Sequence, residues 1–161
     1  MSKCRSSGTA FIDEDKDAQN EAASNDMGNR VLLRARLLFD GGYYERAQQE
    51  LAGLPLDSFP KYKDQLEVTY RLARIYQKTE QEEKAIDLYD KTIANGSSST
   101  FYFAANSALM LGMIYEEKNN LDRAEEYYSK CLAMGRHQYQ NSIDQKAQAG
   151  LDRIKLMRNP D

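Results

Sequence analysis

From Asn29 onward, apolar residues recur at the three- and four-residue spacing of amphipathic helices, and the alternation typical of strands is absent. Short polar turns with glycine, proline, serine or asparagine interrupt this pattern. The pattern predicts an all-α chain, with helices at about 28–40, 43–53, 60–79, 81–95, 100–118, 120–134 and 139–157. Because the helices come in pairs joined by short turns, we expect stacked antiparallel helix pairs.

One stretch, LGMIYEEKNNLDRAEEYYSKC at residues 111–131, has a glycine inside an apolar helical pattern, where glycine costs about 1 kcal/mol relative to alanine. Shifting the stretch back by 39 residues, and then by 38, places small residues at the same positions. These are Ala35, Ala73 and Gly112 on the first helix of each pair, and Ala47, Ala85 and Ala124 on the second. Small residues let neighbouring helices approach to about 8 Å. We therefore expect a domain over 28–158, with repeats at about 28–59, 60–98 and 100–136 and a capping helix at 139–157.

The motif LGMIY, followed by alanine and tyrosine, and its earlier copy LARIY resemble the tetratricopeptide repeat family. The first copy departs from the family pattern, with Arg34 and Leu38 where leucine and tyrosine are expected. The spacing also exceeds the roughly 34 residues of a family repeat, and we expect the added residues at LPLDSFP and NGSSSTFY. The resemblance implies an α-α superhelix, a right-handed solenoid of antiparallel helix pairs.

Residues 1–27 are rich in Ser, Asn, Asp and Glu and poor in large apolar side chains, which predicts a polar, acidic N-terminal tail. Within it, IDEDKDAQNEAAS is compatible with a short helix. Residues 13–26 hold six acidic residues and one lysine, whereas the first two repeats hold most of the arginines. One hypothesis is that the tail docks on or near the concave groove, and a plain linker or a small cap is the alternative.

Length, charge and composition exclude several classes of function. A chain of 161 residues suits one domain, and a net charge of -3 gives no basic balance for nucleic acid or an anionic membrane. We expect no membrane span, since no stretch approaches about 18 apolar residues, and no secretory signal. Cys4 and Cys131 do not form a disulfide framework pattern, which favours a reducing, cytoplasmic location. A periplasmic or other location stays open if the sequence is a piece of a longer chain.

The residue pattern gives little support for catalysis, metal binding or phosphate binding. The sharpest enzymatic hypothesis pairs Cys131 with His137, the only histidine, in a polar turn, and needs the two within hydrogen-bond reach with the thiol open to solvent. However, Cys131 falls in a small-residue position of the repeat, where cysteine is a buried small hydrophobe. Zinc needs several close ligands, and Gly41 and Gly42 lack the rest of a phosphate loop. We expect no enzyme, no metal and no cofactor.

The resemblance implies a concave groove lined by the first helix of each pair, the surface that solenoids use for binding. By register, the candidate peptide-binding residues are Leu32, Arg36, Tyr70, Arg74, Asn106, Leu109 and Met113. Arginines beside apolar residues suit a peptide with an acidic group and apolar side chains. The alternative for each arginine is a solvated charge or one paired within the protein, and the alternative for Tyr70 and Met113 is ordinary packing. The family's clamp for a chaperone tail is not expected, because its places hold Leu32, Arg36, Arg71, Asn106 and Met110.

The function that the sequence favours is thus a non-enzymatic interaction module that binds a peptide or protein segment in its concave groove. The alternative is a structural or oligomerisation segment of a larger repeat protein, or a homo-oligomer, with no groove ligand. An apolar helix face exposed at Asn29 or beyond Leu151 would favour this alternative.

Overall fold

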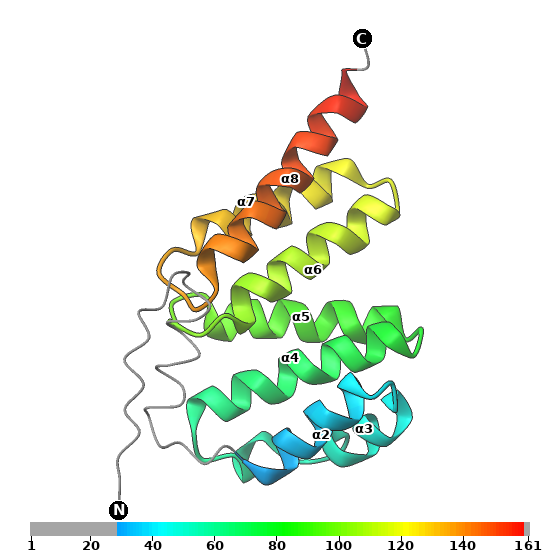
Figure 1. Cartoon of the computed structure of the whole chain (residues 1–161), viewed down its shortest axis with the longest axis vertical. Coiled ribbons are helices and arrows are strands. Elements are labelled where there is room, and N and C mark those ends of the chain that lie inside the picture. The colour runs from blue at the N-terminus through cyan, green and yellow to red at the C-terminus, as the bar shows by residue number, and fades with distance from the viewer. Residues whose placement is uncertain (1–28, 160–161) are drawn as a thin grey trace, which may run out of the picture.

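The structure, a computed structural model, describes residues 29–159. This part of the chain contains seven α-helices, one short 3-10 helix and no strand (Figure 1). The elements are α2 (Arg30–Asp40), α3 (Tyr44–Leu51), η1 (Leu56–Ser58), α4 (Tyr62–Lys78), α5 (Glu82–Gly96), α6 (Phe103–Glu117), α7 (Leu121–Ala133) and α8 (Gln140–Arg158). The predicted all-α class is confirmed. The predicted tail and its short helix lie outside the described residues.

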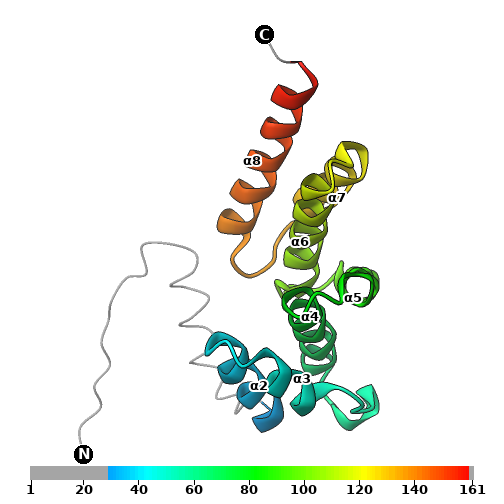
Figure 2. The same cartoon turned by 90° about the vertical axis from the view of Figure 1, so that its right-hand side faces the viewer.

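Consecutive helices pack side by side, so that α2 with α3, α4 with α5 and α6 with α7 form stacked pairs, and α8 follows at the C-terminal end (Figure 1). The view turned by 90° places α2 and α8 on one side of the stack and α5 on the other (Figure 2). This arrangement is an α-α superhelix, as predicted. We call the side formed by α2, α4, α6 and α8 the first-helix side and that formed by α3, α5 and α7 the second-helix side.

The small positions of the repeat lie at the helix contacts. The five alanines at these positions are at most 1% exposed, namely Ala35, Ala47, Ala73, Ala85 and Ala124. Gly112 is also buried. Since a larger side chain would hold the helices apart, these positions explain the close packing of successive helices.

The turn inside each pair repeats the same geometry. Gly42, Glu80 and Asn119 have left-handed backbones with φ of 80°, 59° and 56°. The N–H of the residue after each donates to the carbonyl five residues earlier, as Tyr43 does to Leu38. This is the glycine-type helix ending of the Schellman motif, and its recurrence shows that all three pairs share one local fold.

The ring of Tyr128 lies between two glycines from different helices. An ideal Cβ at Gly112 on α6 would stand 2.5 Å from the ring, and one at Gly150 on α8 would stand 2.4 Å from it. Both helices therefore approach the ring closer than any side chain would allow. Gly150 continues the spacing of Ala35, Ala73 and Gly112, so α8 occupies the place of a first helix.

The segment LPLDSFP forms a link that contains the short helix η1 and does not extend α3. Ala52 has an extended backbone with ψ of 132°, and Gly53 has φ of 83°. Pro55 then precedes η1. These residues stop α3 at Leu51, two positions before the predicted end.

Candidate functional site

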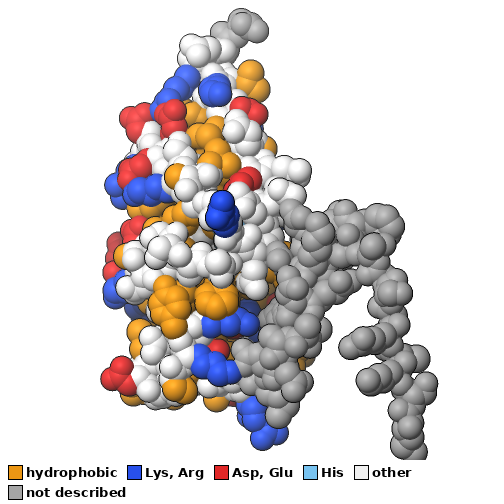
Figure 3. All heavy atoms as spheres, turned by 90° about the vertical axis from the view of Figure 1, so that its left-hand side faces the viewer, with side chains coloured by type: hydrophobic (Ala, Val, Ile, Leu, Met, Phe, Trp, Pro, Cys, Tyr) orange, Lys and Arg blue, Asp and Glu red, His pale blue; other side chains and the backbone are white. Residues whose placement is uncertain are grey.

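The first-helix side is positively charged at its N-terminal half. Helix α2 has three arginines and one aspartate, and α4 has four cations and two acidic residues, so each carries a formal charge of +2. Figure 3, in which the left-hand side of Figure 1 faces the viewer, shows apolar side chains lying among charged side chains of both signs.

Arg74 is the best-positioned cation on this side. Its guanidinium carbon lies 4.5 Å from the centre of the Phe39 ring on α2 and 5.9 Å from that of the Tyr70 ring on α4. A guanidinium over an aromatic face is held by a cation–π attraction. Among residues 29–159 it has no carboxylate partner, whereas the neighbouring Arg71 lies 2.5 Å from Glu67. The charge of Arg74 is thus oriented but not neutralised.

Arg36 is the second cation. Its side chain is 55% exposed, and its Nε lies 3.9 Å from the Asp40 carboxylate one turn further along α2. An exposed pair at this distance contributes little and breaks easily. Arg36 can therefore exchange Asp40 for another acidic group.

The structure buries three of the seven candidate residues. Leu32 is 3% exposed, and Tyr70 and Leu109 are each 1% exposed. Asn106 is partly exposed, and its amide donates to the Tyr70 hydroxyl. Leu32, Tyr70 and Leu109 pack within the protein, so the prediction of a peptide site rests on the other four.

Met113 is 39% exposed and lines a hollow of about 340 Å³ between α6 and α8, together with Glu117, Arg153 and Met157. Arg153 donates two hydrogen bonds of 2.7 and 2.8 Å to Glu116, which also accepts one of 2.5 Å from Tyr128. The bonds from Arg153, followed by that from Tyr128, lower the pKa of Glu116. The floor of the hollow is thus fixed by a charged network that joins α6, α7 and α8.

Sequence reasoning missed Arg153 and Met157, because α8 was assigned only as a cap. The signal that could have found them is Gly150, which continues the series of small residues and makes α8 another first helix.

The enzymatic alternative does not have the geometry it needs. The Cys131 thiol is 0% exposed, and burial raises its pKa to about 12, so it is neither open to solvent nor ionised at neutral pH. The His137 side chain is 2% exposed although its turn is polar, with Nε2 4.0 Å from the Asp144 carboxylate. Its Nδ1 lies 2.8 Å from the Gln138 carbonyl oxygen.

Neither a metal site nor a membrane-spanning helix is found in the described residues. Over 29–159, no three His, Cys, Asp or Glu side chains gather in a way that could hold a metal ion. In the same range, no helix combines the length and apolar character needed to cross a bilayer.

The fold and the site define a helical repeat protein without a visible catalytic centre in its described part. Residues 64–137 match the family model of the tetratricopeptide repeat, so this part of the chain is similar to that family, as its motifs predict. Repeats of this family are protein–protein interaction modules, generally without catalytic activity. No curated protein and no solved structure matched the chain.

Proposed function

We propose that this protein binds a peptide segment of a protein partner on its first-helix side. An acidic group of the peptide would pair with Arg36 and Arg74, and an apolar side chain would enter the hollow beside Met113. The observation that carries the proposal is the position of Arg74, whose guanidinium lies on the Phe39 ring without a carboxylate partner in the described chain. Such a preoriented cation loses little entropy when a carboxylate binds it.

The test is a pull-down from lysate with the wild type beside the double variant Arg36→Glu, Arg74→Glu. Both sites are accessible, so circular dichroism should show unchanged helicity. We expect the double variant to lose the partner that wild type captures. A matched control reverses two exposed cations elsewhere, Lys130→Glu with Lys155→Glu, and should keep that partner. An identical partner list for all three proteins would contradict binding at Arg36 and Arg74.

A second function, a structural segment that joins other helices or another copy, is supported by the two ends of the stack. Leu33 and Leu37 on α2 are 53% and 62% exposed, and Leu156 and Met157 on α8 are 70% and 52% exposed. Exposed leucines four residues apart on one helix form an apolar stripe.

Sedimentation of the full chain tests this second function. Self-association that disappears on Leu33→Ser with Leu37→Ser would support it. A monomer at every concentration would contradict assembly through these ends.

A further inference from the structure

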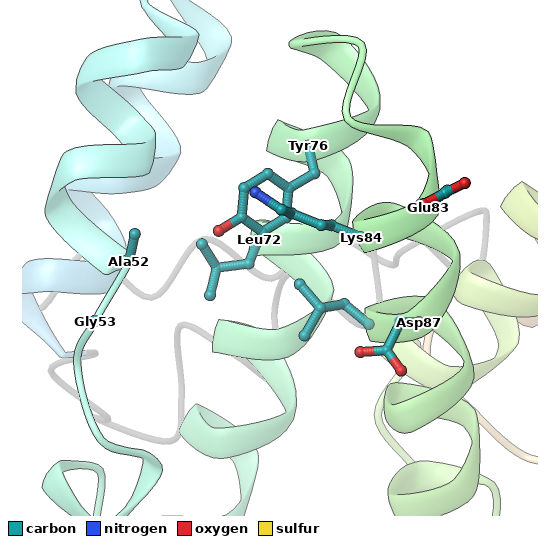
Figure 4. A pocket seen from close by; sticks show the side chains of 8 residues that line it. Ala52, Gly53, Leu72, Tyr76, Glu83, Lys84 and Asp87 are labelled. Atoms are coloured by element: carbon teal, nitrogen blue, oxygen red, sulfur yellow. The ribbon is translucent and has the colours of Figure 1, made fainter.

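Two hollows lie along one stripe of α4, on the second-helix side. The larger, about 430 Å³, is lined by Leu72 and Tyr76 of α4, Leu88 of α5 and Ala52. Leu72 and Tyr76 lie between Ala52 and Asp87 (Figure 4). The smaller, about 210 Å³, is lined by Leu66 and Thr69 of α4 and Leu56 of the link, among others. The α4 residues follow one another at three- and four-residue spacing, so they share one helix face. We call the two hollows together the α3–α5 groove.

The groove exists because α3 is short. Helix α3 has 8 residues, whereas the second helices α5 and α7 have 15 and 13. Ala52 and Gly53 lead the chain away from the helix, and the link that follows exposes Leu54 and Leu56 at 40% and 41%. A longer α3 would continue over the α4 stripe and cover it.

The next repeat shows how the same space is closed. Tyr115 occupies the place of Tyr76 by the 39-residue shift, and Tyr127 occupies that of Leu88. The two rings stack with centres 5.5 Å apart at an angle of 5°, and the Tyr127 hydroxyl donates a 2.8 Å hydrogen bond to Asp90 of α5. With leucine instead of tyrosine at position 88, the α3–α5 groove lacks this ring and stays open.

The rim of the groove is acidic. Helix α5 has four acidic residues and two lysines. Asp87 pairs with Lys91 at 2.7 Å, and Lys84 lies over the Tyr76 ring at 5.3 Å while donating to Gln81. Glu83 also lines the groove, and its carboxylate interacts electrostatically with Lys118 after α6. An apolar floor with more carboxylates than lysines along α5 complements an apolar side chain flanked by a cation.

We propose that the α3–α5 groove binds a basic amphipathic helix of a protein partner, independently of the first-helix side. On α4, the residues lining the two hollows are centred eight to nine positions apart, which is about 13 Å along a helix. A partner helix covers this distance with apolar side chains at positions i, i+4 and i+8. Its basic residues face Glu83 and the rest of the α5 rim.

The experiment uses the full chain and a labelled synthetic helix of about 16 residues, with leucines at positions i, i+4 and i+8 and lysines beside them. Fluorescence anisotropy gives its affinity. A second peptide has the leucines on opposite faces, and a third has glutamates in place of the lysines. We expect the first to bind at least tenfold more tightly than either of the others. Equal binding of the three, or no binding, would overturn the proposal.

Variants of the protein locate the site. Leu88→Tyr introduces the ring that closes the next repeat, and Ala52→Leu fills the same hollow from the exposed opposite edge if Leu88→Tyr does not fold. Each should weaken binding of the basic peptide about tenfold, and Glu83→Lys should weaken it in the same direction. Asp152→Lys on α8, an equal charge reversal at an exposed carboxylate, should leave it unchanged.

The double variant Arg36→Glu, Arg74→Glu separates this proposal from the previous one. It should bind the basic peptide as wild type does. If it lost the peptide while a folded Leu88→Tyr or Ala52→Leu variant kept it, the groove would not be the binding site.

Discussion

The Tyr128 ring limits the residue type at one position of α6 and one position of α8 to glycine. It is 0% exposed, lies between Gly112 and Gly150, and directs its hydroxyl to Glu116. Burial raises the pKa of Tyr128, and its bond to Glu116 adds to this effect. At the residue scale, then, glycine inside α6 and α8 is a packing requirement rather than a point of flexibility.

We expect Gly112→Ala to destabilise the protein, although alanine is the better helix former by about 1 kcal/mol. The new Cβ would stand 2.5 Å from a ring that is fully enclosed, and overpacking of this kind costs about 1 to 3 kcal/mol. Gly150→Ala should behave alike, and Gly112→Leu should be worse. Urea unfolding followed by circular dichroism measures the change.

Gly135→Ala is the matched control, because a Cβ there meets nothing within 4 Å. Its free energy of unfolding should stay close to that of wild type. A Gly112→Ala protein as stable as wild type would show that the Tyr128 ring is not held between the two glycines.

Glu80 is the opposite case, a non-glycine residue at a position where glycine would be less strained. Its φ of 59° lies in the left-handed region, where the equivalent residues Gly42 and Asn119 are types that tolerate it. We expect Glu80→Gly to raise the free energy of unfolding by about 0.5 to 1 kcal/mol, measured by thermal and urea unfolding. Lys78→Gly, two residues earlier and helical, should instead lower it by about 1 kcal/mol. A Glu80→Gly protein less stable than wild type would mean that the turn does not need this conformation.

At the scale of helices, the positions of the helices could be predicted from the sequence, whereas the residues exposed on their surfaces could be predicted only in part. Each helix predicted over 28–157 corresponds to an observed one, and the largest difference is at α6, which begins at Phe103 rather than near 100. Periodicity and turn residues suffice for this because both act locally.

The candidate site was harder to predict. Leu32 and Tyr70 share a helix face with Arg36 and Arg74 in the repeat register, yet the two apolar residues are buried. A first helix contacts neighbours on both sides, so the curvature of the stack decides where its buried stripe ends. The spacing of residues along one helix does not show where its buried stripe ends, because that depends on how the neighbouring helices pack. The α3–α5 groove was missed for a similar reason, since it depends on where α3 stops relative to α5.

The network of Glu116, Tyr128 and Arg153 connects three helices and should make their packing pH-dependent. Because the pKa of Glu116 is lowered in the folded protein, its stabilisation is complete above the unfolded pKa of about 4.3. It is lost as the pH falls through the lower folded value. We expect Glu116→Gln to reduce the free energy of unfolding by about 1 kcal/mol at neutral pH.

The difference between wild type and Glu116→Gln should shrink as the pH falls below about 4. Urea unfolding at a series of pH values measures it. Glu117→Gln, at the exposed adjacent position, should show a much smaller effect at every pH. A Glu116→Gln deficit that did not change with pH would contradict the role of the charge.

At the scale of the molecule, the helices separate charge. On the first-helix side, α2, α4 and α8 carry +2 each and α6 carries -2, which gives +4 in total. On the second-helix side, α3 and α7 carry -1 each and α5 carries -2, which gives -4. The two sides therefore favour partners of opposite charge, and both interactions should weaken with salt because the Debye length is about 8 Å at physiological ionic strength.

This separation gives the N-terminal segment a specific role to test. Residues 13–26 contain six acidic residues and one lysine, and they end three positions before Asn29, the cap of α2. An acidic segment tethered so close to Arg36 would compete with an acidic peptide at a high effective concentration. We expect deletion of residues 1–27 to increase the affinity for an acidic, leucine-containing peptide, measured by fluorescence anisotropy. The increase should disappear at high salt and in the Arg36→Glu, Arg74→Glu variant, where the tail has no cations to occupy. Equal affinity of the full and shortened chains at low salt would instead show that the segment acts as a linker.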